Sequence, residues 1–226
     1  MTPPCPVCTS ANPRHLLTVA GRVYWRCRHC RASFLDPAQR PTRREERAEY
    51  DRHQNSVDDP GYRRFLQPAA EAVGQRVRVG ATVLDYGCGP GPALGMMLRE
   101  RGYRVRLYDP LYRPDPSFLD QRFEAITCTE TAEHFHDPAA EFERLHDLLK
   151  PSGWLVVMTR FQTNDNRFAD WHYRRDPTHV VFYRPQTFTV LGQRFGWRVA
   201  TRRPNLVLIQ RPPVPISASR HGGPAL

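Results

Sequence analysis

The sequence predicts an α/β fold in which a mostly parallel sheet follows a small metal-binding ribbon. Three observations support this. Apolar runs of strand length alternate with helical patterns over residues 62–210, as in βαβ units. A glycine-rich turn follows the first of these runs, at residues 87–91. Two Cys-x-x-Cys pairs stand near the front of the chain, Cys5 with Cys8 and Cys27 with Cys30.

The four cysteines predict a zinc ribbon over residues 1–40. Eighteen residues separate the two pairs, and the segment between them alternates like a hairpin that turns at Ala20-Gly21. Tetrahedral Zn²⁺ favours four thiolates, and each tight turn supplies two. Disulfides or free thiols are the alternatives. We expect a reducing cytoplasm, where disulfides are rare, because no signal peptide precedes the cysteines. A ribbon of this kind either braces its neighbour or recognises a partner.

The glycine-rich turn is the strongest sign of a ligand site. An apolar strand ends in Asp85, three glycines alternate at Gly87, Gly89 and Gly91, and a helix is expected over Ala93–Arg101. Glycines let backbone N–H groups approach a ligand closely, because no Cβ intervenes. The spacing is Gly-x-Gly-x-Gly, which differs from the Gly-x-Gly-x-x-Gly of dinucleotide-binding turns.

The elements that follow continue the alternation. A strand over Arg104–Tyr108 ends in Asp109, 24 residues beyond Asp85, where a Rossmann-like sheet places a ribose-binding carboxylate. A further strand over Phe123–Cys128 is followed by Thr129-Glu130-Thr131-Ala132-Glu133-His134. We then expect a helix that begins at Asp137-Pro138, a strand over residues 154–159, a helix over residues 184–195, and two closing antiparallel strands over residues 197–202 and 206–210.

These motifs together resemble the class I S-adenosylmethionine (SAM) methyltransferases of the ubiquinone-biosynthesis type. The matching features are the glycine turn after an acid, an E-x-x-E-H segment and an L-L-K-P-x-G-x-L pattern, in the family's order over residues 60–210. The resemblance implies a Rossmann-like sheet, SAM as cofactor and methyl transfer as activity. It also implies a set of cofactor-binding residues: Asp85, Tyr86, Gly87, Cys88, Gly89, Gly91, Asp109, Thr129, Glu130 and His134.

One departure concerns the third strand. Only thirteen residues, Pro110–Arg122, separate Asp109 from the next strand, which is too few for a helix, a strand and a second helix. We therefore expect a truncated third strand. The adenine is then held either by Asp115 from an irregular loop or by backbone and apolar packing.

Residues 41–61 and 211–226 flank the methyltransferase-like domain of residues 62–210. The charged segment Arg40–Arg52 predicts a linker helix. In the family, helices ahead of the glycine turn often fold over the cofactor, so Tyr50 and His53 are candidates for a lid that contacts substrate, with exposed linker positions as the alternative. The Pro-, Ser- and Gly-rich tail over residues 211–226 is expected to be disordered.

The loop over residues 161–182 is the expected acceptor pocket. It shows neither helical nor strand periodicity, and it places the aromatic residues Trp171 and Tyr173 among polar ones. His172 and His179 are candidate general bases, because a histidine of ordinary pKa accepts a proton at neutral pH, and Asp176 could orient either ring. A simple turn at Asp176, or a second zinc held by His172, His179 and Asp176, are the alternatives.

The composition limits the partners. A net charge of +10 favours anionic partners, so an RNA methyltransferase that grips RNA with its ribbon is the alternative function. A small-molecule acceptor is favoured, since surface arginines are more often simply solvated. The Asp/Asn-Pro-Pro-Tyr and Pro-Cys motifs of amino and cytosine-C5 methylation do not follow the strand over residues 123–128, which leaves hydroxyl or carbon acceptors, with ring nitrogens as a further alternative. The chain has no apolar run near the length of about 20 that a membrane span needs. The acceptor itself and the oligomeric state stay open.

Overall fold

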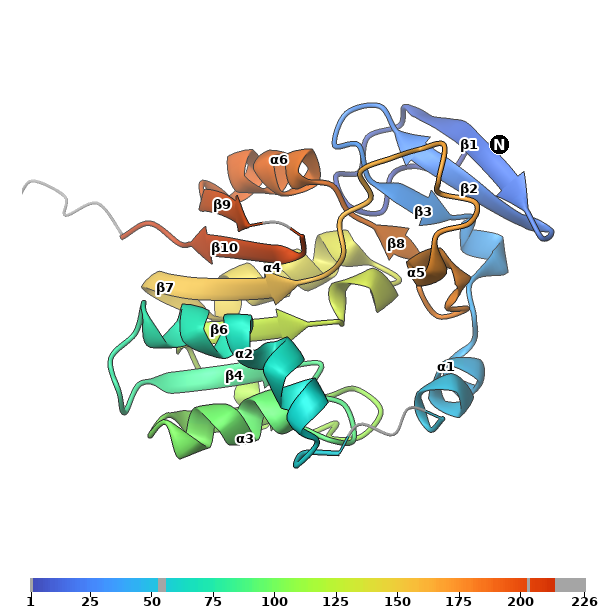
Figure 1. Ribbon diagram of the computed structural model, residues 1–226. Coiled ribbons are helices and arrows are strands. Elements are labelled where there is room, and N and C mark those ends of the chain that lie inside the picture. Colours follow the sequence, from blue (N-terminus) through green and yellow to red (C-terminus); the bar gives the residue numbers. More distant parts are fainter. Residues whose placement is uncertain (1, 53–55, 203, 214–226) are drawn as a thin grey trace, which may run out of the picture.

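The computed structural model describes residues 2–52, 56–202 and 204–213 of the 226-residue chain. Its main sheet has six strands in the order β5-β4-β6-β7-β10-β9 (Figure 1). The strands β5, β4, β6 and β7 are parallel, and β10 runs antiparallel to both of its neighbours. The α/β prediction is therefore confirmed. The strands are β4 Thr82–Tyr86, β5 Arg104–Tyr108, β6 Phe123–Thr129, β7 Leu149–Met158, β9 Arg198–Arg202 and β10 Leu206–Gln210.

Helices cover both faces of this sheet. Helices α2 (Pro60–Gly74) and α3 (Ala93–Glu100) lie on one face, and α4 (Pro138–Leu148) and α6 (Pro185–Phe195) lie on the other. Side chains alternate along each strand, so β4 sends Val83 toward the α2 and α3 side and Leu84 toward the opposite side. This alternation produces the two apolar layers that a sheet between helices requires.

The truncated third strand is confirmed. Strand β5 is at the edge of the sheet, and the described segment Pro110–Arg122 contains a short 3₁₀ helix over Pro116–Phe118 and no strand of its own. Asp115 caps that 3₁₀ helix by accepting a hydrogen bond from the Ser117 N–H at 2.9 Å. The chain thus passes from β5 to β6 through an irregular loop.

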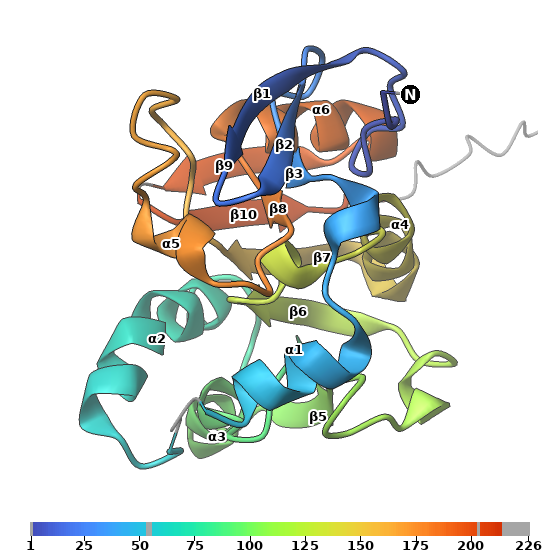
Figure 2. The ribbon, with the colours of Figure 1, turned by 90° about the vertical axis from the view of Figure 1, so that its right-hand side faces the viewer.

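A second sheet stands at the carboxyl end of the first (Figures 1 and 2). Its four antiparallel strands are β1 (Pro13–Val19), β2 (Arg22–Cys27), β3 (Ser33–Leu35) and β8 (Val181–Phe182). The predicted hairpin at Ala20-Gly21 is present between β1 and β2. Strand β8 comes from the segment expected to lack periodicity, which also forms the one-turn helix α5 (His172–Arg175). Two residues are too short to show a period, and their partner strand is distant in sequence.

The amino-terminal sheet and the segment over residues 161–182 share one core. The Leu35 N–H donates to the Val180 carbonyl at 2.9 Å, beside the β3–β8 pairing. The fully buried Arg26 forms an ion pair with Asp165 at 2.5 Å, so a charge anchors β2 to the segment after β7. A 3₁₀ turn (Pro37–Gln39) and helix α1 (Arg43–Tyr50) then lead the chain toward the glycine turn. Among the described residues, no helix is long and apolar enough to cross a membrane.

Candidate active site

A cavity of about 850 Å³ opens where the carboxyl ends of β4, β5 and β6 meet. This edge of a parallel sheet is the usual place for a ligand, because loops from neighbouring strands converge there. Its walls come from the glycine turn, the loop after β5, the segment after β6, helix α1 and helix α5. The predicted residues that line it are Tyr50, Tyr86, Gly87, Cys88, Gly89, Gly91, Asp109, Thr129, Glu130, His134, His172, Tyr173, Asp176 and His179.

Gly87 and Gly89 have backbone conformations that favour glycine, with φ of +78° and +62°. A Cβ at Gly87 would lie 2.1 Å from Cγ2 of Thr131, so the turn packs tightly against the loop after β6. At Gly89 a Cβ would meet no described atom within 4 Å. The first glycine therefore permits packing, while the second keeps space open above the turn.

Asp109 joins the glycine turn to the loop after β5. Its Oδ2 accepts a hydrogen bond from the Gly89 N–H at 2.9 Å, and its Oδ1 accepts from the N–H groups of Leu111 and Tyr112 at 2.9 and 3.0 Å. Three backbone donors fix the carboxylate at the cavity wall. A carboxylate held there is suited to accept hydrogen bonds from a pair of ribose hydroxyls.

Asp85 lies beneath the turn and is only 2% exposed. Its Oδ1 accepts a hydrogen bond from Thr127 at 2.8 Å, and burial raises its pKa to about 6. It joins β4 to Thr127 of β6 and is not among the residues that line the cavity. Burial also raises the pKa of the neighbouring Cys88 to about 12, so this thiol stays protonated.

Helix α1, in the amino-terminal part of the chain, forms one wall of the cavity. Its buried Glu46 accepts a hydrogen bond from Nε2 of His136 at 2.8 Å, and the ring of Tyr50 meets that of His134 edge to face with centroids 5.1 Å apart. Just after the helix, Asp51 accepts a hydrogen bond from the Tyr112 hydroxyl at 2.6 Å. The helix therefore bridges the loops after β5 and β6, as a lid would. His53 lies outside the described residues.

The segment after β6 places two carboxyl groups and a histidine beside the cavity. Glu130 has a φ of +47°, and burial together with nearby Glu133 raises its pKa to about 9. Glu133 is fully buried, and its Oε1 accepts a hydrogen bond from the Tyr173 hydroxyl at 2.6 Å. Sequence reasoning assigned no role to Glu133, although it stands within the E-x-x-E-H segment.

The segment over residues 161–182 brings its histidines to the same cavity. His172 is exposed at the start of α5 and lines the cavity. His179 is 7% exposed, and its Nδ1 lies 2.6 Å from the Tyr173 carbonyl while its Nε2 lies 3.7 Å from Asp176. Trp171 is not among the lining residues; its ring packs on Tyr173 and Phe182, at centroid distances of 5.1 and 5.9 Å.

The Asp176 carboxylate is held in the charged form. Burial opposes its ionisation, but the facing His179 and two hydrogen bonds from Thr178 together lower its pKa. The ring of His134 lies with its centroid 4.7 Å from that of His179, and burial followed by repulsion from His179 lowers the pKa of His134. Neutral His134 and ionised Asp176 therefore flank His179.

Asp115, which was one of the two alternatives for holding the adenine, does not line the cavity. Asp115 is exposed, contacts Arg106 at 3.2 Å and is not among the lining residues. The neighbouring wall is instead formed by Leu111 and Tyr112.

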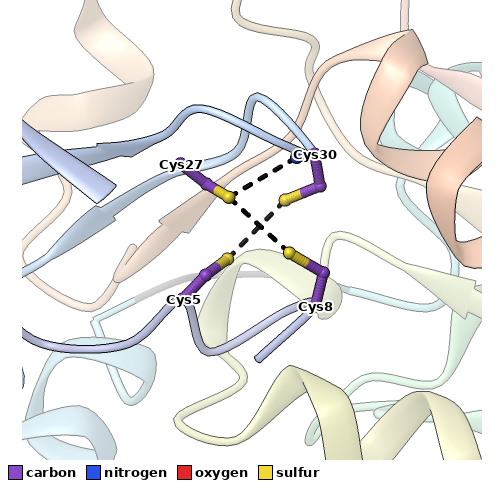
Figure 3. A group of neighbouring side chains, drawn as sticks. All are labelled: Cys5, Cys8, Cys27 and Cys30. Carbon is purple, nitrogen blue, oxygen red and sulfur yellow. Dashed lines mark hydrogen bonds between the residues drawn. The ribbon is translucent and has the colours of Figure 1, made fainter. Parts of the chain in front are cut away.

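The four amino-terminal cysteines converge (Figure 3). The sulfurs of Cys5 and Cys30 are 3.6 Å apart, as are those of Cys8 and Cys27. A disulfide needs about 2.05 Å, whereas tetrahedral Zn–S bonds of about 2.3 Å place sulfurs about 3.8 Å apart. The backbone N–H of Cys30 also points at the Cys27 sulfur, at 3.4 Å. The residues present therefore fit a tetrahedral metal.

Comparisons with known proteins agree with this architecture. The profile of a family described as "Methyltransferase domain" matches residues 32–202. Ubiquinone biosynthesis O-methyltransferases from Leptothrix cholodnii and Xylella fastidiosa are 32% and 34% identical to this chain over 104 and 107 residues. These matches cover 35% of this chain and 44% and 42% of the relatives, so the chain matches less than half the length of either.

Solved structures share the fold. An O-methyltransferase family protein from Burkholderia thailandensis has a TM-score of 0.55 at 15% identity, covering 79% of this chain and 66% of that one. The 1,6-didemethyltoxoflavin-N1-methyltransferase of the same organism, solved with bound 1,6-didemethyltoxoflavin and S-adenosylhomocysteine, has a TM-score of 0.53 at 18% identity, covering 90% of this chain and all of that one. The profile match covers most of the sequence, and the chain belongs to the methyltransferase domain family.

Proposed function

We propose that this protein is a SAM-dependent methyltransferase that transfers a methyl group to a hydroxyl or carbon acceptor on a small molecule. The observation that carries the proposal is the single cavity that joins the glycine turn and Asp109 to His172, His179 and Asp176. Methyl transfer needs the donor and the acceptor side by side, because the reaction is an in-line displacement at the methyl carbon.

The donor half of the cavity fits SAM. Asp109 would accept hydrogen bonds from the ribose hydroxyls, and the open space over Gly89 would admit the methionine half. SAM supplies the activated methyl group. The protein would hold the acceptor beside the donated methyl group, and helix α1, which carries Tyr50 and Glu46, would exclude water.

The acceptor half offers two candidate general bases. His172 reaches the cavity from the start of α5. For His179, donation from Nδ1 to the Tyr173 carbonyl leaves Nε2 as the basic nitrogen, with Asp176 close enough to stabilise the protonated ring. Either would remove the proton from an acceptor hydroxyl. The curated relatives are named as O-methyltransferases, which favours a hydroxyl acceptor.

We propose zinc at the four cysteines, with a structural role. The metal would fix both Cys-x-x-Cys turns, and β3 would in turn hold β8 and the segment that carries His179. Zinc would thus stabilise the part of the cavity wall that carries His179. This arrangement favours bracing over RNA recognition, because the ribbon sheet is tied into the methyltransferase core.

Transfer of labelled methyl groups tests the proposed function. Purified protein is incubated with methyl-labelled SAM and a lysate of the source organism, and the label is then fractionated. We expect label in the small-molecule fraction, and none when the lysate is omitted. Label in a nuclease-sensitive fraction would instead support the RNA methyltransferase alternative and contradict the small-molecule acceptor.

A further inference from the structure

We propose a second metal site at the inner end of the cavity, formed by Glu133, His134 and His179 and suited to a divalent transition-metal cation. One potential ligand atom of each residue lies within 4.8 Å of those of the other two. Glu133 and His134 come from the loop after β6, and His179 comes from the segment before β8. The fold therefore brings two distant segments together at one point.

The histidines are oriented as metal ligands usually are. Nδ1 of His134 lies 3.1 Å from the Thr178 carbonyl, and Nδ1 of His179 lies 2.6 Å from the Tyr173 carbonyl. A carbonyl can only accept, so each Nδ1 carries the proton and each Nε2 keeps its lone pair. Metal-binding histidines typically donate their other N–H to a carbonyl or carboxylate in this way, which fixes the ring and its tautomer.

The Glu133 carboxylate has one oxygen that is available to bind a metal. Oε1 of Glu133 accepts the hydrogen bond from the Tyr173 hydroxyl, whereas Oε2 is fully buried and has no hydrogen-bond partner among the described residues. An unpaired carboxylate oxygen is costly to bury, and a bound cation would offset that cost. The nearby Glu130 has a buried Oε1 that also lacks a described partner.

Two histidines and one carboxylate suit a cation such as Zn²⁺, Fe²⁺ or Mn²⁺. Metal–ligand bonds of about 2.0–2.2 Å require ligand atoms roughly 3–3.6 Å apart, so these atoms, which lie within 4.8 Å of one another, need to approach by at most about 1–2 Å. Three protein ligands leave at least one position open, and both histidines line the cavity. An acceptor oxygen would occupy the open position; this last step alone rests on the proposed function.

This set of ligands differs from the one that the loop sequence indicated. His172 and Asp176 belonged to that set together with His179. Among the described residues, the three whose potential ligand atoms all lie within 4.8 Å of one another are instead Glu133, His134 and His179. With His179 bound to a metal, His172 is the histidine that remains on the cavity wall for proton transfer.

A cobalt titration tests the site without requiring turnover. The full-length protein, with zinc at the four cysteines, is titrated with Co²⁺ and followed by absorbance. We expect one further equivalent of Co²⁺ to give weak visible bands without the intense thiolate charge-transfer band. His134→Ala, His179→Ala and Glu133→Gln should each weaken this binding at least tenfold, and His172→Ala should leave it unchanged.

The controls separate loss of the site from loss of the fold. SAM affinity and the circular dichroism spectrum are measured for every variant. If a variant fails to fold, the number of Co²⁺ ions that the wild-type protein binds decides whether the second site exists. No Co²⁺ bound outside the thiolate site in the wild-type protein would overturn the proposal. So would loss of binding in His172→Ala with retention in His134→Ala. Intact SAM binding in either case would leave the proposed function standing.

Discussion

Replacing Gly87 with alanine tests the packing of the glycine turn, with Gly89→Ala as the matched control. Both residues have positive φ, so both variants carry the strain of a left-handed alanine. They differ in their surroundings. The added Cβ at Gly87 would lie 2.1, 2.4 and 2.8 Å from three side-chain atoms of Thr131, and that at Gly89 would meet no described atom within 4 Å.

The two costs can be worked out separately. A left-handed alanine costs roughly 1–2 kcal/mol, and this is the whole expected effect of Gly89→Ala on the free energy of unfolding. At Gly87 the overlap adds about 1–3 kcal/mol. Displacing Thr131 also loses the hydrogen bond that its single hydroxyl proton shares between the carbonyls of Gly87 and Thr129, at about 1 kcal/mol. Gly87→Ala should therefore be destabilised by roughly 3–6 kcal/mol in total.

Urea unfolding of the SAM-free proteins, followed by circular dichroism, measures both values. A double variant, Gly87→Ala with Thr131→Gly, should recover the overlap part because all three clashing atoms are gone. Equal destabilisation by Gly87→Ala and Gly89→Ala would refute the reasoning, since it would show that Thr131 yields without cost.

Three further predictions concern buried charge and metal. Burial raises the pKa of Asp85 from 3.8 to about 6, so the folded state binds the proton more tightly and the free energy of unfolding falls as pH rises from about 4 to about 6. The stability advantage of the wild type over Asp85→Asn, measured by urea unfolding at pH 4 and pH 7, should therefore shrink by about 2–3 kcal/mol; a constant difference would be inconsistent with the raised pKa. Asp165→Ala leaves the guanidinium groups of Arg26 and Arg184 without their shared carboxylate and should lower the free energy of unfolding by about 3–5 kcal/mol, whereas an effect below 1 kcal/mol would mean that water replaces the carboxylate. Cys8→Ser should reduce the bound zinc, measured by elemental analysis, and expose the β3–β8 pairing to hydrogen exchange with little change in SAM affinity; unchanged exchange at β8 would argue against bracing.

The sequence predicted which residues gather at the glycine turn because these signals are local. Asp85, the alternating glycines and Asp109 each stand at the end of a strand, and parallel strands bring those ends to one edge. The truncated third strand could also be predicted from a local feature, because the number of residues between β5 and β6 limits how many helices and strands that connection can contain. The position of Tyr50 at the cavity wall required only that a helix precede the turn.

The acceptor half depends on pairings that the sequence does not show. Strand β8 is two residues long and takes its place from β3, at the other end of the chain. The approach of Glu133 and His134 to His179 follows from that placement, and so does the packing of Trp171 onto Phe182. The residue types at 161–182 indicated a pocket. The pairing of β8 with the amino-terminal sheet determines which side chains line it.

A calorimetric titration with SAM tests the central claim most directly. Wild-type protein should bind SAM in the cavity, and Asp109→Ala should bind at least tenfold more weakly, because it loses the carboxylate that would accept from the ribose hydroxyls. Asp115→Ala is the control, since Asp115 is exposed and lies off the cavity wall, and its affinity should equal that of the wild type. Equal affinity in all three proteins, or no binding to the wild type, would contradict the account.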